Sequence, residues 1–122
     1  MILGLGNDIL EIERIREAIE TQGDRFIQKL FSKREQAYCK KHADPMPHYA
    51  ARFSAKEAIV KALGTGFGGQ ASFHDIEIIN DDLGKPEVFF SDALNDKFNH
   101  PQVLLSISHC KHYVATVAIR IK

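Results

Sequence analysis

The sequence predicts one α+β domain in which an antiparallel sheet packs against a single long, buried helix. One β-rich segment is followed by several helical patterns and then by β-rich segments separated by turns, an order typical of α+β folds. Residues 48–63 are helical in pattern and apolar around most of the helix circumference, which indicates a buried helix. The chain has 122 residues, of which 44% are hydrophobic, and these values suit a single domain over residues 1–122.

The first half of the chain contains one predicted strand and four predicted helices. Residues 2–12 are rich in β-forming residues, and Gly4, Gly6 and Asp8 would share one face of that strand. Two glycines on a strand face leave room for a ligand or for another backbone. Ser32 and Glu35 have the spacing of a capping box, which starts a helix. Helices are expected over 11–20, 24–30, 32–42 and 48–63.

The second half is dominated by β-strand patterns. After a glycine-rich loop at 64–70, strands are predicted over 73–79, 87–90, 102–109 and 113–121. A turn is predicted at 81–86 and a short helix at 92–98.

Four charged residues interrupt the apolar surface of the long helix. Glu57 and Lys61 lie one turn apart in one sector, and Arg52 and Lys56 share a second sector. Buried charges are costly unless they are paired or bound, so a metal or a phosphate is a natural partner. The alternative for Glu57 and Lys61 is an ordinary i,i+4 ion pair on a solvated face.

The loop that follows, Gly64-Thr65-Gly66-Phe67-Gly68-Gly69, could bind phosphate through backbone N–H groups. It is not a Walker loop, because it follows a helix and lacks the Gly-Lys-Ser/Thr signature. The helix dipole repels phosphate at this end, so Lys61 and a cation held by Glu57 would supply the positive charge. Alternatively, Gly64 simply ends the helix in a left-handed conformation.

Asp8 is the best second candidate ligand for such a cation, because it interrupts an apolar strand beside two glycines. Two carboxylates with phosphate oxygens and water make a typical Mg²⁺ site. The alternative is that Asp8 lies at the end of the strand and caps the next helix.

Composition narrows the class of protein. Net charge is zero, but basic residues predominate over 25–42 and acidic residues over 71–99. The basic segment could bind RNA or DNA by charge alone, yet it lacks an aromatic platform and the acidic half opposes a polyanion, so we expect no nucleic acid partner.

No signal peptide or membrane span is evident, so we expect a cytoplasmic protein with no membrane partner. Zinc-binding atom types without a standard ligand spacing occur at Cys39, His42, His109, Cys110 and His112.

Six short motifs occur in order along the chain. They are Gly6-Asn7-Asp8-Ile9, Arg52 to Ala58 with Lys61-Ala62, Gly64-Thr65-Gly66, Phe73 to Ile78, Gly84-Lys85-Pro86 and Ser106-Ile107-Ser108-His109. Together they resemble the holo-acyl-carrier-protein synthase family, the small bacterial-type 4′-phosphopantetheinyl transferases, over essentially the whole chain. Asn7 departs from the family pattern, which has an apolar residue before the aspartate.

The resemblance implies the 4′-phosphopantetheinyl transferase fold and transfer of the phosphopantetheine arm of coenzyme A to a serine of apo-acyl carrier protein. Adenosine 3′,5′-bisphosphate is the other product, and the reaction supports fatty acid biosynthesis. By similarity, Asp8 and Glu57 hold Mg²⁺ against the pyrophosphate, and Lys61 binds phosphate oxygens. The serine proton would pass to Glu57 or to water on the metal, and Gly64, Thr65 and Gly66 would lie along the nucleotide.

The resemblance also implies a homotrimer with active sites between subunits. Arg52 points about 140° away from Glu57 around the helix. In such a trimer Arg52 and His109 would contact a nucleotide bound mainly by a neighbouring subunit, and Ser108 is a further residue expected to bind the coenzyme. Without the resemblance, Arg52 would be a helix-surface arginine and His109 a strand-end histidine. The acidic carrier protein would dock on the first helix through Arg14 and Arg16, together with Arg25.

Overall fold

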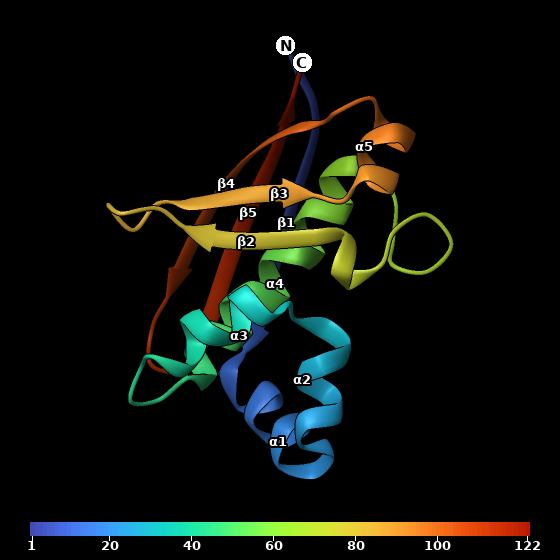
Figure 1. Ribbon diagram of the computed structural model, residues 1–122. Coiled ribbons are helices and arrows are strands. Elements are labelled where there is room, and N and C mark those ends of the chain that lie inside the picture. Colours follow the sequence, from blue (N-terminus) through green and yellow to red (C-terminus); the bar gives the residue numbers. More distant parts are fainter.

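The computed structural model describes residues 1–122 and contains five strands, five α-helices and one 3₁₀ helix. The elements are β1 (Ile2–Glu11), α1 (Ile12–Gln22), α2 (Asp24–Leu30), α3 (Lys33–Lys40), α4 (Met46–Leu63), η1 (Phe73–Asp75), β2 (Ile76–Asn80), β3 (Pro86–Phe90), α5 (Asp92–Phe98), β4 (Gln102–His109) and β5 (Tyr113–Ile121) (Figure 1). The predicted α+β class, with antiparallel sheet and long buried helix, is confirmed. None of the helices combines the length and the apolar character needed to cross a bilayer.

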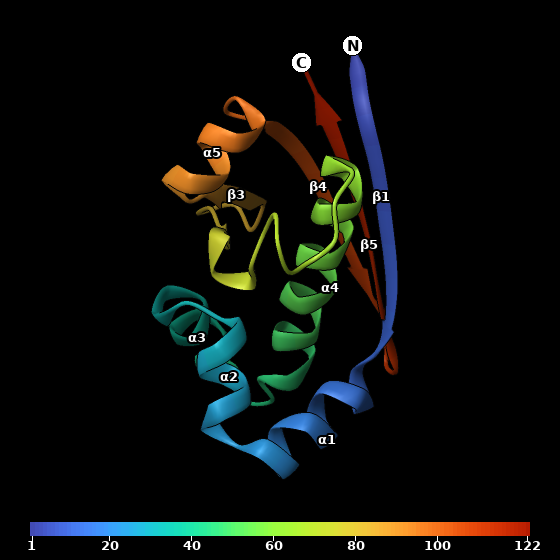
Figure 2. The ribbon, with the colours of Figure 1, turned by 90° about the vertical axis from the view of Figure 1, so that its right-hand side faces the viewer.

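The strands form two separate antiparallel units on either side of α4. β5 pairs with β1 and with β4 to give a three-stranded sheet of order β1-β5-β4, while β2 and β3 form a hairpin. Figure 2 shows α4 against one face of the three-stranded sheet, with the hairpin, α3 and α5 on its other side. The two termini meet at the end of the molecule opposite α1 and α2, where the Lys122 N–H donates to the Met1 carbonyl at 3.0 Å.

Several element boundaries differ from the sequence prediction by one to three residues: α1 extends to Gln22 and α3 ends at Lys40, for example. Two of the differences have a clear physical reason. The strand predicted over 73–79 is wrong for its first three residues, which form η1 because Ser72 and Asp75 cap each other as a capping box. The long helix begins at Met46, two residues earlier than predicted. Pro47 lies in its first turn, where a missing backbone N–H leaves no helical hydrogen bond unmade.

The two glycines of β1 allow this strand to lie directly on the backbone of α4. A Cβ atom on Gly4 would lie 1.9 Å from the Ala62 carbonyl oxygen, and one on Gly6 would lie 1.9 Å from that of Ala58. No side chain larger than hydrogen fits at either position. The room that the sequence predicted on this strand face is therefore filled by another backbone, and this contact places Asp8 against the last turns of α4.

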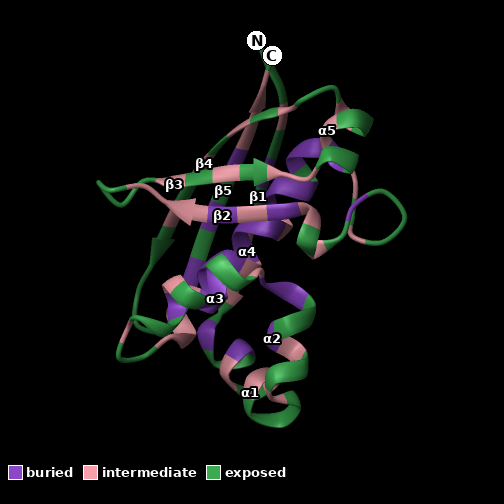
Figure 3. Cartoon of the chain, in the orientation of Figure 1, coloured by how far each residue is buried: buried purple, intermediate pink, exposed green.

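The core surrounds α4, which is buried around most of its circumference (Figure 3). Ile59, Val60 and Leu63 belong to a cluster with residues of the β2–β3 hairpin side, such as Ile78 and Leu94. Because strand residues alternate between faces, the neighbours of Gly4, Gly6 and Asp8 point away from α4. That outer sheet face carries large apolar residues exposed by 40–71%: Leu3, Leu5, Ile9, Leu104, Tyr113 and Val117.

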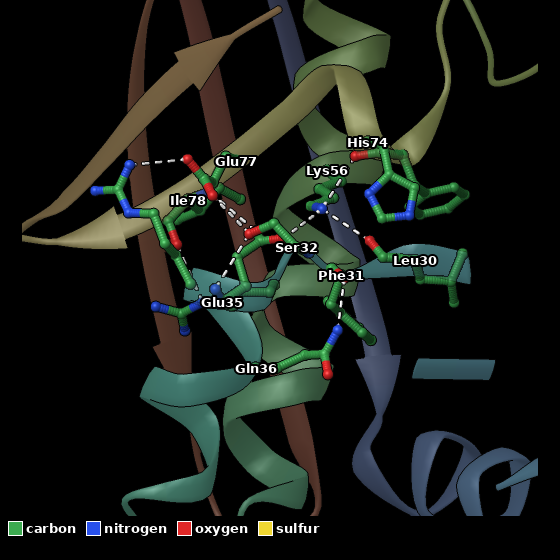
Figure 4. Close-up of polar contacts among 12 residues, drawn as sticks. Leu30, Phe31, Ser32, Glu35, Gln36, Lys56, His74, Glu77 and Ile78 are labelled. Atoms are coloured by element: carbon green, nitrogen blue, oxygen red, sulfur yellow. Dashed lines mark hydrogen bonds and ion pairs between the residues drawn. The ribbon is translucent and has the colours of Figure 1, made fainter. Parts of the chain in front are cut away.

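A fully buried ion pair joins α4 to the elements around it (Figure 4). The Lys56 Nζ lies 2.8 Å from Glu35 Oε1, and neither side chain is exposed. The same ammonium donates to the carbonyls of Leu30 and Phe73 at 2.8 and 3.0 Å, and Glu35 Oε2 accepts from the Ile78 N–H at 3.0 Å. The prediction that Lys56 needs a partner is confirmed, but the partner is Glu35 of the same chain and not a metal or a phosphate.

Candidate active site

Asp8, Glu57 and Lys61 come together where β1 crosses the end of α4. The Lys61 Nζ donates to the Asn7 carbonyl at 2.8 Å and lies 3.4 Å from Asp8 Oδ1. Asp8 is close enough to Glu57 to raise the pKa of that carboxyl. The two carboxylates that the sequence proposed as partners therefore belong to one cluster with the predicted phosphate-binding lysine, which we call the acidic cluster.

The electrostatics of the acidic cluster favour an added cation. Burial is the main cause that raises the pKa of Glu57, the repulsion from Asp8 is the second, and Lys61 opposes both. No third His, Cys, Asp or Glu side chain joins the two carboxylates. The chain therefore offers a cation held here two carboxylates and no third carboxylate, imidazole or thiolate. Mg²⁺ fits this donor set, because it is usually bound by one or two carboxylates together with substrate phosphates and waters.

Two simpler roles for these residues are not found. Lys61 pairs with Asp8, and the i,i+4 ion pair between Glu57 and Lys61 does not form. Asp8 does not cap the next helix, since α1 begins after Glu11 without any side-chain capping bond.

The glycine loop begins directly beside Lys61. Gly64 has φ +82° and ends α4 in the left-handed conformation, with its N–H directed to the carbonyls of Val60 and Lys61. Gly64 therefore acts as the helix C-cap that the sequence allowed. Gly66 is exposed, and a Cβ atom there would meet nothing within 4 Å. Gly64, Thr65 and Gly66 thus form an open rim next to the acidic cluster.

A second site, the basic cleft, lies on a different side of α4. It is a cavity of about 180 Å³ whose lining includes Arg52, His48 and His109 but neither Asp8 nor Glu57. Arg52 and Glu57 do not share this cleft, and that they serve two different clefts stays a prediction. Arg52 is only 2% exposed, and its Nε and Nη2 donate to the Ile78 carbonyl at 3.1 Å and to Asn80 Oδ1 at 2.6 Å. Arg52 is therefore a buried, preorganised residue and not a helix-surface arginine.

Not every predicted nucleotide residue reaches the basic cleft. His109 lines it together with Ile107, two positions earlier on the same face of β4. Ser108 lies between them and points to the outer sheet face, where it is exposed. Its side chain is therefore separated from Arg52 by the sheet.

The three predicted docking arginines lie on α1 and α2. Arg14 lies 3.6 Å from Glu11, and Arg25 is exposed on α2. Arg16 is more constrained, because its Nη2 lies 2.9 Å from Asp44 and its Nε lies 3.4 Å from Glu13. Arg14 and Arg25 are thus less constrained than Arg16.

Sequence reasoning missed two residues at or near these sites. Glu35 was predicted only as a capping residue, and it does complete that capping box, yet it also neutralises Lys56. His48 was treated only as the start of the long helix, although its position one turn before Arg52 was a signal that both share a face. The zinc alternative gains no support, since no group of three or more His, Cys, Asp or Glu side chains suited to a metal is present.

Comparison with known proteins identifies the fold. A family model for the 4′-phosphopantetheinyl transferase superfamily matches residues 4–118. The chain belongs to this superfamily. It is 52% identical over 119 residues to the holo-[acyl-carrier-protein] synthase of Protochlamydia amoebophila, with 98% of each chain covered. The resemblance predicted from the six ordered motifs is therefore confirmed.

Solved structures of superfamily members agree closely with this chain. The crystal structure of holo-[acyl-carrier-protein] synthase from Neisseria meningitidis matches with a TM-score of 0.92 at 35% identity, covering 100% of both chains. The Bacillus anthracis holo-(acyl-carrier-protein) synthase in complex with CoA (3′,5′-ADP) matches with a TM-score of 0.84 at 37% identity. That match covers 98% of this chain and 96% of the other.

Proposed function

We propose that this chain transfers the 4′-phosphopantetheine group of coenzyme A to a serine of apo-acyl carrier protein and releases adenosine 3′,5′-bisphosphate. The convergence of Asp8, Glu57 and Lys61 carries the proposal, because it gives a chain of this superfamily the charges that a pyrophosphate substrate requires. The transfer belongs to fatty acid biosynthesis and lipid metabolism, and we place it in the cytoplasm.

Asp8 and Glu57 are the residues that would hold Mg²⁺. When bound, the metal neutralises the charge that develops on the transferred and leaving phosphates. Lys61 binds phosphate oxygens as a point charge, which its half-exposed side chain allows. The open rim of Gly64, Thr65 and Gly66 lies along the nucleotide.

Glu57 is the acceptor within the chain for the proton of the attacking serine. As the serine oxygen bonds to the β-phosphorus of coenzyme A, its proton passes to the carboxylate and the bond to the bridging oxygen breaks.

The direct test is mass spectrometry of apo-acyl carrier protein after incubation with this chain, Mg²⁺ and coenzyme A. The expected result is a gain of one phosphopantetheine arm. Asp8→Asn and Glu57→Gln should each lower the rate by at least about 100-fold. Asp82→Asn, the same kind of change in an exposed turn, is the matched control and should leave the rate unchanged. An unmodified carrier protein with the unaltered chain would refute the function, and wild-type rates in Asp8→Asn would refute the metal assignment.

The outer sheet face supports assembly into a homotrimer. Six large apolar residues gather on this face, and contiguous exposed apolar surface marks an interaction site. Leu5→Arg places a charge on a residue that is 66% exposed in the single chain, so it should prevent association without unfolding the subunit. Leu83→Arg is the control, since Leu83 is 94% exposed in the β2–β3 turn. Sedimentation should show that Leu5→Arg is monomeric, whereas the unaltered chain and Leu83→Arg are trimeric. A trimeric Leu5→Arg variant would exclude this interface.

The separation of the basic cleft from the acidic cluster supports active sites shared between subunits. In this arrangement Arg52 and His109 of one subunit bind the 3′-phosphate of a coenzyme A molecule held by the neighbour's acidic cluster. Arg52→Ala should weaken coenzyme A binding about 10-fold to 100-fold while leaving dephospho-coenzyme A binding unchanged.

Subunit mixing tests this arrangement further. Co-expressed Arg52→Ala and Glu57→Gln chains should recover activity, because some mixed trimers contain an intact site. Co-expressed Asp8→Asn and Glu57→Gln chains are the control, since both changes damage the same cluster. Equal recovery in the two mixtures, or none in either, would contradict shared sites.

The carrier protein is proposed to dock on α1 and α2 through Arg14, Arg16 and Arg25. Their charge complements the acidic helices of a carrier protein and mainly accelerates encounter. The freedom of Arg14 and Arg25 predicts that their substitution raises KM for the carrier protein more than substitution of Arg16 does.

A further inference from the structure

The basic cleft gathers positive charge without any acidic lining. It lies between the start of α4, the β2–β3 turn and the end of β4, and its ionisable lining groups include Arg52, His48 and His109. No carboxylate lines it. Three potential cations around a cavity of about 180 Å³ favour an anion of small size.

Arg52 is held in a fixed orientation at this cleft. In addition to its bonds to Ile78 and Asn80, its guanidinium lies over the Tyr38 ring, 4.1 Å from the centroid. Asn80 is itself fixed, because its Nδ2 donates to the Gly84 carbonyl at 2.9 Å. The remaining terminal nitrogen, Nη1, has no acceptor within the chain and is available to an anion.

His48 is held beside Arg52 by two ring contacts. Its imidazole stacks on His42, with centroids 3.5 Å apart and planes at 23°, and meets the Tyr38 ring edge-on at 5.8 Å. The Nδ1 of His42 lies 3.0 Å from the Tyr38 carbonyl and must donate, because a carbonyl only accepts. The pair is therefore a packed aromatic platform whose outer ring borders the cleft.

The charges around His48 oppose its protonation while the cleft is empty. Burial lowers the pKa of His48 most, followed by repulsion from His42, Arg52 and His109, whereas Asp44 alone raises it. Asp44 is already bound by Arg16, and a further cation, Lys41, lies 5.1 Å from the centre of the Tyr38 ring. An anion in the cleft would reverse this balance, because a negative charge within hydrogen-bonding distance favours imidazolium.

We infer that His48 is a further ligand of the phosphate-binding cleft, which takes a phosphate monoester together with one proton on His48. The inference rests on the proposed function, in which the monoester is the 3′-phosphate of coenzyme A. A monoester carries close to two negative charges at neutral pH, more than the singly charged phosphates of the pyrophosphate bridge. The neutral His48 of the empty cleft becomes the charged donor of the occupied one.

His48→Phe is the sharpest variant, because phenylalanine keeps a flat aromatic ring against His42 and Tyr38 and has no ring nitrogens. Affinities for coenzyme A and for dephospho-coenzyme A, which lacks the 3′-phosphate, are measured by calorimetry between pH 6 and pH 8. Titration of the ligand is common to both proteins, so at each pH the affinity of the unaltered chain is divided by the affinity of His48→Phe for the same ligand. His100→Asn, a substitution of an exposed histidine at the end of α5, is the control.

At pH 6 the unaltered chain should bind coenzyme A about tenfold more tightly than His48→Phe does, and the ratio should approach one at pH 8. For dephospho-coenzyme A the ratio should stay near one throughout. A coenzyme A ratio that does not change with pH, or the same change with dephospho-coenzyme A, overturns the inference and leaves the proposed function intact. Absence of coenzyme A binding by the unaltered chain overturns both.

A second measurement does not depend on the folding of a variant. The ring resonances of His48 are followed by NMR against pH, with and without adenosine 3′,5′-bisphosphate. The bisphosphate should move the titration of His48 to higher pH, a response that a purely structural histidine would not give. An unchanged titration with the ligand bound contradicts the inference.

Discussion

Replacing Lys56 with methionine should strongly destabilise the chain, because it leaves the carboxylate of Glu35 buried without its cation. Neither side chain is exposed, and the ammonium makes three short contacts within the chain. Breaking one partner out of a buried pair costs about 3–5 kcal/mol. The lower end of this range applies here, because Glu35 still accepts hydrogen bonds from the N–H groups of Ser32 and Ile78. The Phe73 carbonyl also keeps its hydrogen bond from the Ile76 N–H.

A loss of about 3 kcal/mol corresponds to a urea midpoint lower by about 2 M at a slope of about 1.5 kcal/mol per molar. The chain has no tryptophan, so unfolding is followed by far-ultraviolet circular dichroism at one fixed protein concentration. Lys29→Met makes the same chemical change at an exposed site on α2 and should stay within about 0.5 kcal/mol of the unaltered chain.

A double-mutant cycle with Glu35→Gln separates the ion pair from simple loss of packing. If the two residues are paired, the Lys56→Met/Glu35→Gln double variant should be less destabilised than the sum of the single variants. Strict additivity, or a Lys56→Met midpoint as high as that of Lys29→Met, would refute the reasoning about the buried pair.

Three further predictions follow from other contacts. Gly6→Ala should destabilise the chain by about 3 kcal/mol or more and abolish activity, because its Cβ would overlap the Ala58 carbonyl, whereas Gly69→Ala, with nothing within 4 Å, should be mild in the same urea assay. Lys61→Ala should lower kcat at saturating coenzyme A by about tenfold or more, and an unchanged kcat would remove Lys61 from the transfer step. His48 has a lowered pKa when folded, so the unfolded chain binds more protons between that pKa and the ordinary value of 6.5. In phosphate-free buffer, stability should therefore fall as pH drops below 6.5, and His48→Phe should fall less between pH 7.5 and pH 5.5. Equal losses in both chains would contradict this assignment.

The sequence by itself determined the secondary elements and their class. Local signals such as the Ser32 and Glu35 capping box and the left-handed Gly64 act between residues close in the chain, so they can be predicted without a fold. The same is true of the roughly opposite directions of Arg52 and Glu57 on α4, because helix geometry alone sets that angle. The predicted start of a strand at Phe73 was wrong, because Ser72 and Asp75 cap each other and form a 3₁₀ helix within a β-rich segment.

Only the tertiary structure decided which charges meet. A charged residue in an apolar helix predicts that a partner exists, but the identity of the partner depends on which elements pack together. Lys56 pairs with Glu35 of α3, while Lys61 pairs with Asp8 of β1. The pair of Lys61 and Asp8 depends on Gly4 and Gly6, which allow β1 to lie directly on the backbone of α4. No local sequence pattern predicts that contact. His48 likewise gained a role only when folding placed its ring between His42 and the cleft of Arg52.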